Sequence, residues 1–178
     1  MGCKIIWFTG LSGSGKTTLA RRLKIFLINK NFKCLQIDGD SFRFKKKYKN
    51  SFTRSSIIRN NNLIIKDVER RKKYNDFIIV SVISPIKITR EKAKKKFGDN
   101  YVEIFVNCSI KVLFKRDTKG LYRLAKNNQI KNLIGYNSNI KYEKTKYKKI
   151  VVNTNIQNIN QSLNKIILKI KKKFNVKI

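Results

Sequence analysis

Continuous apolar runs alternate along this chain with stretches in which apolar residues recur at helical spacing. The continuous runs predict buried strands at residues 4–8, 34–37, 77–83, 101–106 and 150–154. Apolar residues that recur every three or four positions predict helices at residues 17–29, 57–74, 87–97, 110–116 and 159–174. Strands that alternate with helices are typical of an α/β fold, in which helices cover both faces of a parallel sheet. The pattern therefore predicts one domain over residues 1–178, built on a five-stranded parallel sheet flanked by helices.

The loop after the first strand carries the strongest chemical signal. Residues 10–17 read Gly-Leu-Ser-Gly-Ser-Gly-Lys-Thr, between a predicted buried strand and a predicted amphipathic helix. This spacing in this context is a Walker A loop, so the fold is expected to be P-loop NTPase-like. The glycines let successive N–H groups point at one phosphate group, and the following helix directs its positive dipole end there. The residues expected to bind the triphosphate of ATP are Gly10, Leu11, Ser12, Gly13, Ser14, Gly15, Lys16, Thr17 and Thr18.

Charged groups beside this loop supply the expected catalytic chemistry. Lys16 places a cation on the β- and γ-phosphates, and the Thr17 hydroxyl is the expected Mg²⁺ ligand. The second strand ends at Asp38-Gly39-Asp40, where Gly39 is expected to allow a tight turn. One carboxylate, Asp38, can hold Mg²⁺, and the other, Asp40, can accept the proton of an attacking hydroxyl. The alternative is a helix cap plus a surface acid.

Two further segments follow predicted strands and are expected to reach the same edge of the sheet. Arg43, one turn beyond Asp40, can bind the anionic group of an acceptor. Ser84, at the end of the central strand, is either a phosphoacceptor or substrate contact, or the N-cap of a helix that Pro85 starts. These two interpretations of Ser84 are equally supported by the sequence alone.

Residues 117–149 form a polar stretch rich in Lys and Asn, which predicts a mobile lid rather than core. Basic residues at its start, Arg116 and Lys119, can close over the triphosphate and stabilise the transferred charge.

The charge balance is extreme, with 43 Lys and Arg against 10 Asp and Glu and a formal net charge of +33. Such a surface attracts polyanions non-specifically, which leaves a basic nucleic-acid-binding P-loop protein as an alternative of another class. The basic residues are scattered, which favours compositional drift instead. The three cysteines have no metal-ligand spacing and are expected to be free thiols in a cytoplasmic protein. No apolar run is long enough for a membrane span, and the first strand leaves no room for a targeting segment.

Taken together, the motifs resemble those of the adenylyl-sulfate kinase family, whose members phosphorylate the 3′-hydroxyl of adenylyl sulfate to give 3′-phosphoadenylyl sulfate in sulfate activation. The matching segments are residues 6–20, Asp38-Gly39-Asp40 with Arg43, residues 83–85, residues 116–122 without Thr118, and, more weakly, Gly135 with Tyr142-Glu143. The resemblance covers nearly the whole chain and implies ATP and Mg²⁺ as cofactors. The ATP site would also include Arg116. The acceptor site that it implies consists of Asp40, Arg43, Phe52, Asn60, Ile83, Ser84, Lys119, Gly120 and Leu121, with Phe52 stacked on the adenine and Ser84 at the family's phosphoserine position.

One departure from the family bears on the acceptor. Ser56-Ile57 stands where the family has Asp-Arg, and that arginine normally helps to hold the sulfonucleotide. A 3′-hydroxyl kinase for another activated nucleotide, such as a cytidine diphosphoramidate, is therefore a second hypothesis. A separate ATP sulfurylase is expected to supply adenylyl sulfate, and a homodimer is left open as the assembly.

Overall fold

The computed structural model describes residues 2–45 and 52–178, with the side chains of residues 43–45 left outside that description. Its centre is a five-stranded sheet in which every neighbouring pair is parallel and the order is β2-β3-β1-β4-β5. The strands are β1 (Lys4–Thr9), β2 (Cys34–Asp38), β3 (Phe77–Ser81), β4 (Tyr101–Asn107) and β5 (Ile150–Asn153). The predicted five-stranded parallel sheet is therefore confirmed.

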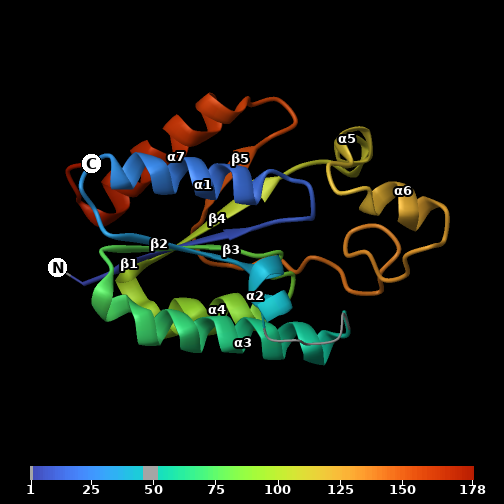
Figure 1. The fold of residues 1–178 in the computed structure, drawn as a ribbon, viewed down its shortest axis with the longest axis horizontal. Coiled ribbons are helices and arrows are strands. Elements are labelled where there is room, and N and C mark those ends of the chain that lie inside the picture. The colour runs from blue at the N-terminus through green and yellow to red at the C-terminus, as the bar shows by residue number, and fades with distance from the viewer. Residues whose placement is uncertain (1, 46–51) are drawn as a thin grey trace.

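Helices cover both faces of this sheet. They are α1 (Lys16–Ile28), α2 (Gly39–Lys45), α3 (Arg54–Arg71), α4 (Lys87–Phe97), α5 (Ile110–Arg116), α6 (Leu121–Lys126) and α7 (Ile159–Phe174), with short 3₁₀ turns at Lys72–Tyr74 and Gly98–Asn100. Figure 1 shows α1 and α7 on one face, α3 and α4 on the other, and α5 with α6 set apart at the end where the phosphate-binding loop lies.

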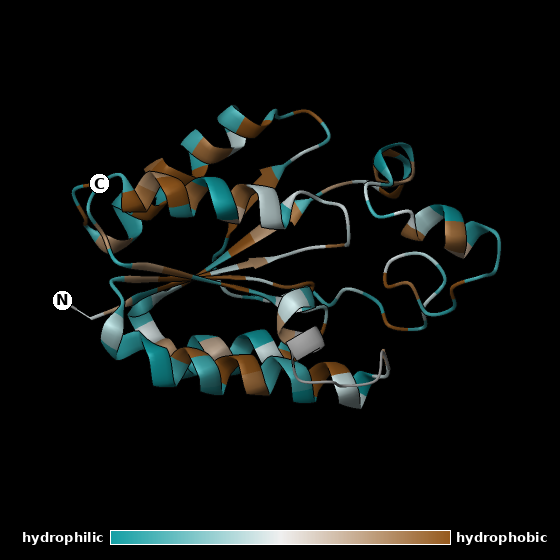
Figure 2. Cartoon of the chain, viewed as in Figure 1, coloured by the Kyte–Doolittle hydropathy of each residue, from teal (hydrophilic) through white to brown (hydrophobic). Residues whose placement is uncertain are grey.

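Alternation along the central strand divides the core into two layers. Ile6 and Phe8 of β1 pack with α1 and α7 in one buried cluster, while Ile5 and Trp7 pack with α3 and α4 in another. Successive side chains of a strand point to opposite faces, and a central parallel strand is buried on both. Figure 2 shows the result, with apolar residues along the strands and polar residues on the outer sides of the helices.

Several elements differ from the prediction. The short helices α2 and α6 were not predicted, and β3 ends at Ser81 rather than at residue 83. Helix α3 begins at Arg54 because Thr53 caps it, its side chain accepting a hydrogen bond from the Ser56 N–H. These elements are short or lie at ends, where a local polar contact decides the conformation and apolar periodicity carries little signal.

Residues 117–149 contribute more buried surface than their polar composition predicts. Tyr122, Ala125 and Leu133 are buried and pack with Cys108 and Leu113 in a cluster of their own. The expectation of a lid rather than core is wrong for these buried residues, because a few apolar residues among many lysines suffice to form a small core.

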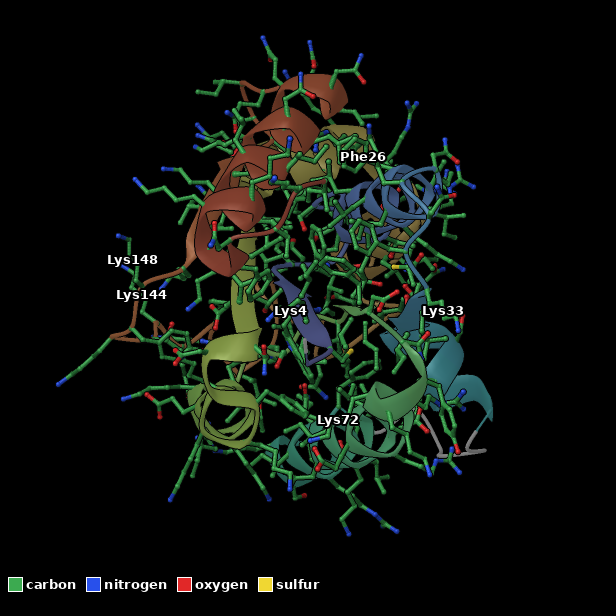
Figure 3. The ribbon with its side chains drawn as sticks, turned by 90° about the vertical axis from the view of Figure 1, so that its left-hand side faces the viewer. Lys4, Phe26, Lys33, Lys72, Lys144 and Lys148 are labelled. Atoms are coloured by element: carbon green, nitrogen blue, oxygen red, sulfur yellow. The ribbon has the colours of Figure 1, made fainter. Side chains whose placement is uncertain are left out.

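Figure 3 looks onto a face that carries lysines from three places in the chain, Lys33, Lys72 and the stretch with Lys144 and Lys148. The basic residues on this face are spread out rather than gathered in one patch. In the described ranges, no helix combines the length and the apolar character needed to cross a membrane.

Candidate active site

The carboxyl ends of the strands bring the phosphate-binding loop and the acidic segment into one pocket of about 660 Å³. This is where ligands bind in open parallel sheets. From the predicted set, the pocket is lined by Ser12, Gly13, Ser14, Gly15, Lys16, Thr17, Thr18, Asp38, Asp40, Ile83, Arg116 and Lys119. Gly10, Leu11, Asn60, Ser84, Gly120 and Leu121 are not among its lining residues.

The three glycines of the loop, Gly10, Gly13 and Gly15, have positive φ angles that other residues rarely adopt. Gly10 has φ of 140°, and a Cβ there would lie 2.5 Å from the Val106 carbonyl oxygen. Gly15 has φ of 99° and caps the start of α1. The loop therefore curls directly into the helix, which leaves its N–H groups and the helix dipole facing the pocket.

Lys16 is buried in the curl of this loop. Its Nζ donates a hydrogen bond to the Leu11 carbonyl at 2.6 Å. Burial lowers the pKa of Lys16 from 10.5 to about 8, with Lys119 adding to the lowering and Asp40 and Asp38 opposing it. A phosphate in the pocket would supply the counter-charge that the buried ammonium lacks.

The lowered pKa predicts a pH dependence for nucleotide capture. Above about pH 8, Lys16 of the free protein loses its proton and no longer offers a cation to the phosphates. We expect kcat/KM for ATP to fall about tenfold per pH unit above that value. The kcat at saturating ATP should stay level over the same range, because bound phosphates raise the pKa of Lys16. Initial rates from about pH 6 to about pH 10 test this, and a flat kcat/KM profile would contradict it.

Both carboxylate oxygens of Asp38 accept hydrogen bonds from neighbouring hydroxyl and N–H groups. Its Oδ2 accepts hydrogen bonds from the Thr17 hydroxyl at 2.9 Å and the Ser81 hydroxyl at 3.0 Å. Its Oδ1 accepts from the N–H groups of Asp40 and Ser41 at 3.1 and 3.3 Å. Burial alone raises the pKa of Asp38, but these hydrogen bonds outweigh it and lower the pKa. Asp38 is therefore held as an anion beside Thr17.

Asp40 has a different environment from Asp38. Its carboxylate forms an ion pair with Lys119, and the two side chains are 71% and 48% exposed, respectively. Lys119 thus reaches from the 117–149 segment to the acidic residue at the mouth of the pocket. Of the two aspartates, Asp40 is exposed and Asp38 is only partly exposed.

Gly39 does not form the predicted tight turn. It is the first residue of α2, without a positive φ, and a Cβ there would lie 2.8 Å from Val82 Cγ2. Close packing against the loop after β3, rather than backbone freedom, explains why glycine stands between the two aspartates.

The polar groups of the pocket suit a hydrated Mg²⁺ with nucleotide phosphates. Mg²⁺ is usually held by one or two carboxylates together with phosphate oxygens and water, and not by an all-protein cage. The Thr17 hydroxyl and the Asp38 carboxylate lie together in the pocket wall beside Lys16. Within the described ranges, no three His, Cys, Asp or Glu residues are grouped as metal ligands.

Arg116 is fixed against the segment that follows β5. Its guanidinium donates hydrogen bonds to the Thr154 carbonyl and, at 3.3 Å, to the Thr154 hydroxyl, which in turn donates to the Ser14 carbonyl at 3.1 Å. The pocket is also lined by residues that the sequence analysis missed, namely Leu19, Arg22, Ser81, Val82, Thr118, Thr154, Gln157, Asn158, Ile159, Asn160 and Ser162. Several follow β5 directly, so the strand-end rule could have identified them.

Asn60 and Ser84, two of the predicted acceptor residues, are buried outside the wall of this pocket. Asn60 of α3 is buried, and neither its amide nitrogen nor its amide oxygen has a hydrogen-bond partner within the described structure. A buried amide left without partners costs free energy unless a ligand satisfies it. Its neighbour Asn61, which sequence reasoning missed, accepts a hydrogen bond from the Ser84 hydroxyl at 2.8 Å.

Neither sequence interpretation of Ser84 describes its position fully. The expectation that its hydroxyl points into the site is wrong for this conformation, since Ser84 is buried and bonded to Asn61. The N-cap alternative is also wrong, because α4 begins at Lys87, after Ile86, and Pro85 lies outside it. The carboxylate of Glu143 accepts a hydrogen bond from the Lys87 N–H at 2.6 Å and so takes over the capping.

The structure describes the positions of some of the other predicted acceptor residues, but not the side chain of Arg43. Phe52 precedes α3 and is 37% exposed, and the side chain of Arg43 lies outside the described part of the structure. Gly120 caps the start of α6 with φ of 67°. Ile57, at the family's arginine position, is buried with Ile86 and Ile134 in an apolar cluster.

The 117–149 segment contacts the phosphate-binding loop at two points. The Tyr122 hydroxyl donates a hydrogen bond to the Ser12 carbonyl at 2.8 Å. Gly135, with φ of 89°, packs so closely that a Cβ would lie 2.6 Å from Leu11 Cδ2. The segment therefore rests on the phosphate-binding loop in this conformation.

The parallel sheet, the curled glycine loop and the paired aspartates together define a P-loop protein of the nucleotide-kinase type. The profile of the family described as Adenylylsulphate kinase matches residues 2–153. The chain belongs to the adenylyl-sulfate kinase family.

Relatives and solved structures agree with this assignment. The adenylyl-sulfate kinase of Clostridium kluyveri is 39% identical over 166 residues, which cover 92% of this chain and 81% of that protein. The adenylyl-sulfate kinase of Prochlorococcus marinus is 34% identical over 170 residues, which cover 93% and 82%. The fold matches the APS kinase CysC of Mycobacterium tuberculosis, solved in complex with AMPPNP and APS, with a TM-score of 0.84 at 24% identity over 96% and 98% of the two chains.

Proposed function

We propose that this chain transfers the γ-phosphoryl group of ATP to the 3′-hydroxyl of adenylyl sulfate, giving ADP and 3′-phosphoadenylyl sulfate. The observation that carries the proposal is the pairing of two aspartates beside the phosphate-binding loop. Asp38 is locked to Thr17, whereas Asp40 remains exposed at the mouth of the pocket. This division supports one carboxylate for ordering the triphosphate side and one for the acceptor hydroxyl.

Most of the catalytic work in such a reaction is positioning and charge stabilisation. The loop N–H groups and Lys16 hold the phosphates, and Arg116 and Lys119 add positive charge around the transferring group. Asp40 accepts the proton of the 3′-hydroxyl as its oxygen attacks phosphorus and the bond to the ADP oxygen breaks. Thr17 and Asp38 are the residues that would hold Mg²⁺, which would neutralise negative charge on the phosphates.

The acceptor nucleotide lies, in this proposal, between α3 and the loop after β3. The partnerless amide of Asn60 offers both a donor and an acceptor to the nucleotide. Phe52 supplies an aromatic surface for the base, Arg43 a cation for the phosphosulfate, and Ile83, Ser84 and the Lys119-Gly120-Leu121 segment the remaining walls.

An ADP-release assay with MgATP and a panel of acceptors tests the proposal. The panel contains adenylyl sulfate, adenosine monophosphate, a cytidine diphosphate derivative and single-stranded RNA. We expect saturable ADP release with adenylyl sulfate and only background with the others. Turnover with a different nucleotide would mean that the apolar surroundings of Ile57 respecify the acceptor pocket.

The compartment, the lid and the assembly of the chain are also part of this proposal. We infer that the chain works in the cytoplasm as one kinase domain over residues 1–178, with a lid at about 117–149 that closes over both nucleotides. Adenylyl sulfate comes from a separate ATP sulfurylase, and a homodimer is the assembly to test by light scattering. Non-specific binding to polyanions follows from the charge of +33 and should weaken steeply with added salt.

A further inference from the structure

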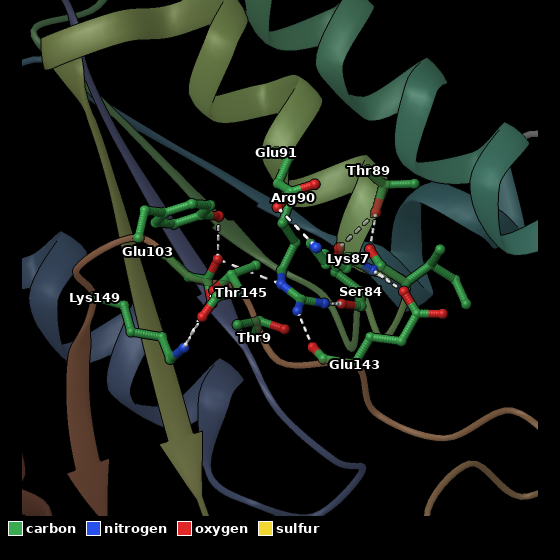
Figure 4. Close-up of polar contacts among 12 residues, drawn as sticks. Thr9, Ser84, Lys87, Thr89, Arg90, Glu91, Glu103, Glu143, Thr145 and Lys149 are labelled. Atoms are coloured by element: carbon green, nitrogen blue, oxygen red, sulfur yellow. Dashed lines mark hydrogen bonds and ion pairs between the residues drawn. The ribbon is translucent and has the colours of Figure 1, made fainter.

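Arg90 of α4 lies at the centre of a buried polar cluster between the sheet and the loop after β3 (Figure 4). The side chain is fully buried, and its Nε lies 3.3 Å from the carboxylate of Glu103, which is buried as well. Nη1 donates a hydrogen bond to the Ser84 carbonyl, and Nη2 donates one to the Glu143 carbonyl. The guanidinium also lies 4.6 Å from the centroid of the Tyr142 ring. One side chain thus contacts the acceptor-side loop and the end of the 117–149 segment together.

Glu143 fastens this segment to the start of α3 and to the residues that follow Ser84. Its Oε1 lies 2.6 Å from Nη1 of Arg54, and its Oε2 accepts from the Lys87 N–H at 2.6 Å. Its backbone N–H donates to the Pro85 carbonyl at 2.9 Å. Burial raises the pKa of Glu143, but the hydrogen bonds from Arg54 and the Lys87 N–H outweigh it and lower the pKa. The carboxylate is therefore ionised in its bound position.

Tyr142 extends the same connection to the phosphate-binding loop. Its hydroxyl lies 2.9 Å from the Thr9 hydroxyl. Thr9 donates to the Ile83 carbonyl at 2.6 Å, so its oxygen accepts from Tyr142. Thr9 directly precedes Gly10, the first residue of the loop. The ring that stacks on Arg90 is thus bonded to the strand end that carries the Walker A sequence.

The backbone of Ser84 adopts a strained conformation, which the contacts of this cluster stabilise. It has φ of 45°, a left-handed conformation that is unfavourable for a residue other than glycine. Such strain persists only where the surroundings over-determine the backbone. Its hydroxyl is bonded to Asn61 and its carbonyl to Arg90, so both ends of the residue are fixed. Of these two contacts, only the guanidinium also holds the 117–149 segment.

We propose that Arg90 is a positioning residue for the acceptor site, which locks the strained Ser84 backbone to the Tyr142-Glu143 segment by bridging their carbonyl groups. The proposal rests on the function proposed above, because it takes the loop at Ser84 as part of the acceptor site. Arg90 does not line the nucleotide pocket, so its effect on substrate is exerted through Ser84 and Glu143.

The test is Arg90→Lys, which keeps a cation beside Glu103 and so avoids leaving a buried carboxylate unpaired. A lysine ammonium lacks the planar fork of donors that reaches two carbonyls at once. We expect the KM for adenylyl sulfate to rise about tenfold, with the KM for ATP within about twofold of wild type. Equal changes in both KM values, or no change in either, would overturn the positioning role. The matched control is Lys95→Met, which removes an exposed cation from the same helix and should leave both constants unchanged.

A second readout does not depend on the acceptor. In Arg90→Lys, amide hydrogen exchange should become faster at Lys87 and Glu143, whose N–H groups are bonded across the cluster, while exchange in the β1 strand stays at the wild-type rate. Unchanged exchange at both amides would overturn the proposal even if the wild-type protein uses another acceptor. Wild-type protein that fails to turn over adenylyl sulfate would instead refute the proposed function alone, so the two failures are distinguishable.

Discussion

Lys16→Ala is expected to abolish turnover, with kcat/KM for ATP falling by at least about a thousandfold. The ammonium is the only predicted point charge of the Walker A motif on the transferring phosphates. It lies buried in the loop that curls around them, where an electrostatic contact is stronger than in water. Initial-rate measurements with MgATP and adenylyl sulfate provide the comparison with wild type.

The fold should tolerate this substitution. Because burial depresses the pKa of Lys16, its charged form opposes folding below about pH 8, and that opposition fades as pH rises towards the unfolded value of 10.5. Removing the charge at pH 7 should therefore leave the melting temperature at or above that of wild type. Arg21→Ala removes an exposed cation from the same helix and is expected to keep full activity. Activity in Lys16→Ala within about tenfold of wild type would contradict the assigned role.

Asp40→Asn is expected to lower kcat by about a hundredfold to ten-thousandfold, which is the usual contribution of a general base. An amide keeps the size of the carboxylate but cannot accept the proton of the attacking hydroxyl. The dissociation constant for ATP should change little, because the phosphates are held by the loop and Lys16. Titration calorimetry with a non-hydrolysable ATP analogue, alongside steady-state kinetics, separates binding from turnover.

A comparison with Lys119→Met separates the role of Asp40 as the base from its ion pair with Lys119. Asp40 pairs with Lys119, but both side chains are well exposed, so the ion pair contributes little to stability. Lys119→Met breaks the same pair and keeps Asp40, and should therefore lower kcat much less than Asp40→Asn does. Equal losses in the two variants would mean that the carboxylate contributes no more than the charge of Lys119, which would contradict the assigned role of Asp40 as the base.

Periodicity predicted the parts of this fold that depend on burial. The continuous apolar runs located all five strands, and the Walker A spacing placed Lys16 and Thr17 beside Asp38, because parallel strands end at one edge. The residues of this pocket are either close together in the sequence or lie at the ends of neighbouring strands. Both kinds of proximity can be predicted from the pattern along the chain.

Polar contacts between distant segments could not be predicted in the same way. Glu143 caps α4, although it lies 56 residues beyond Lys87 in the sequence. Arg90 is one of 43 basic residues, and nothing in the sequence distinguishes it from the others as a buried one. Ser84 follows a strand as expected, yet its hydroxyl turns to Asn61 because the loop adopts a left-handed conformation there. Gly39 is explained by Val82 only when the loop after β3 is seen beside it.

The most direct test of the account is identification of the product by ³¹P NMR after reaction of the purified protein with MgATP and adenylyl sulfate. The account predicts a phosphomonoester resonance on the 3′-oxygen of the sulfonucleotide, appearing in equal amount to ADP. Adenylyl sulfate with a 3′-deoxyribose is the matched negative control and should give no product. ADP formed with inorganic phosphate, and without a 3′-phosphate, would contradict the account and reduce the chain to an ATPase.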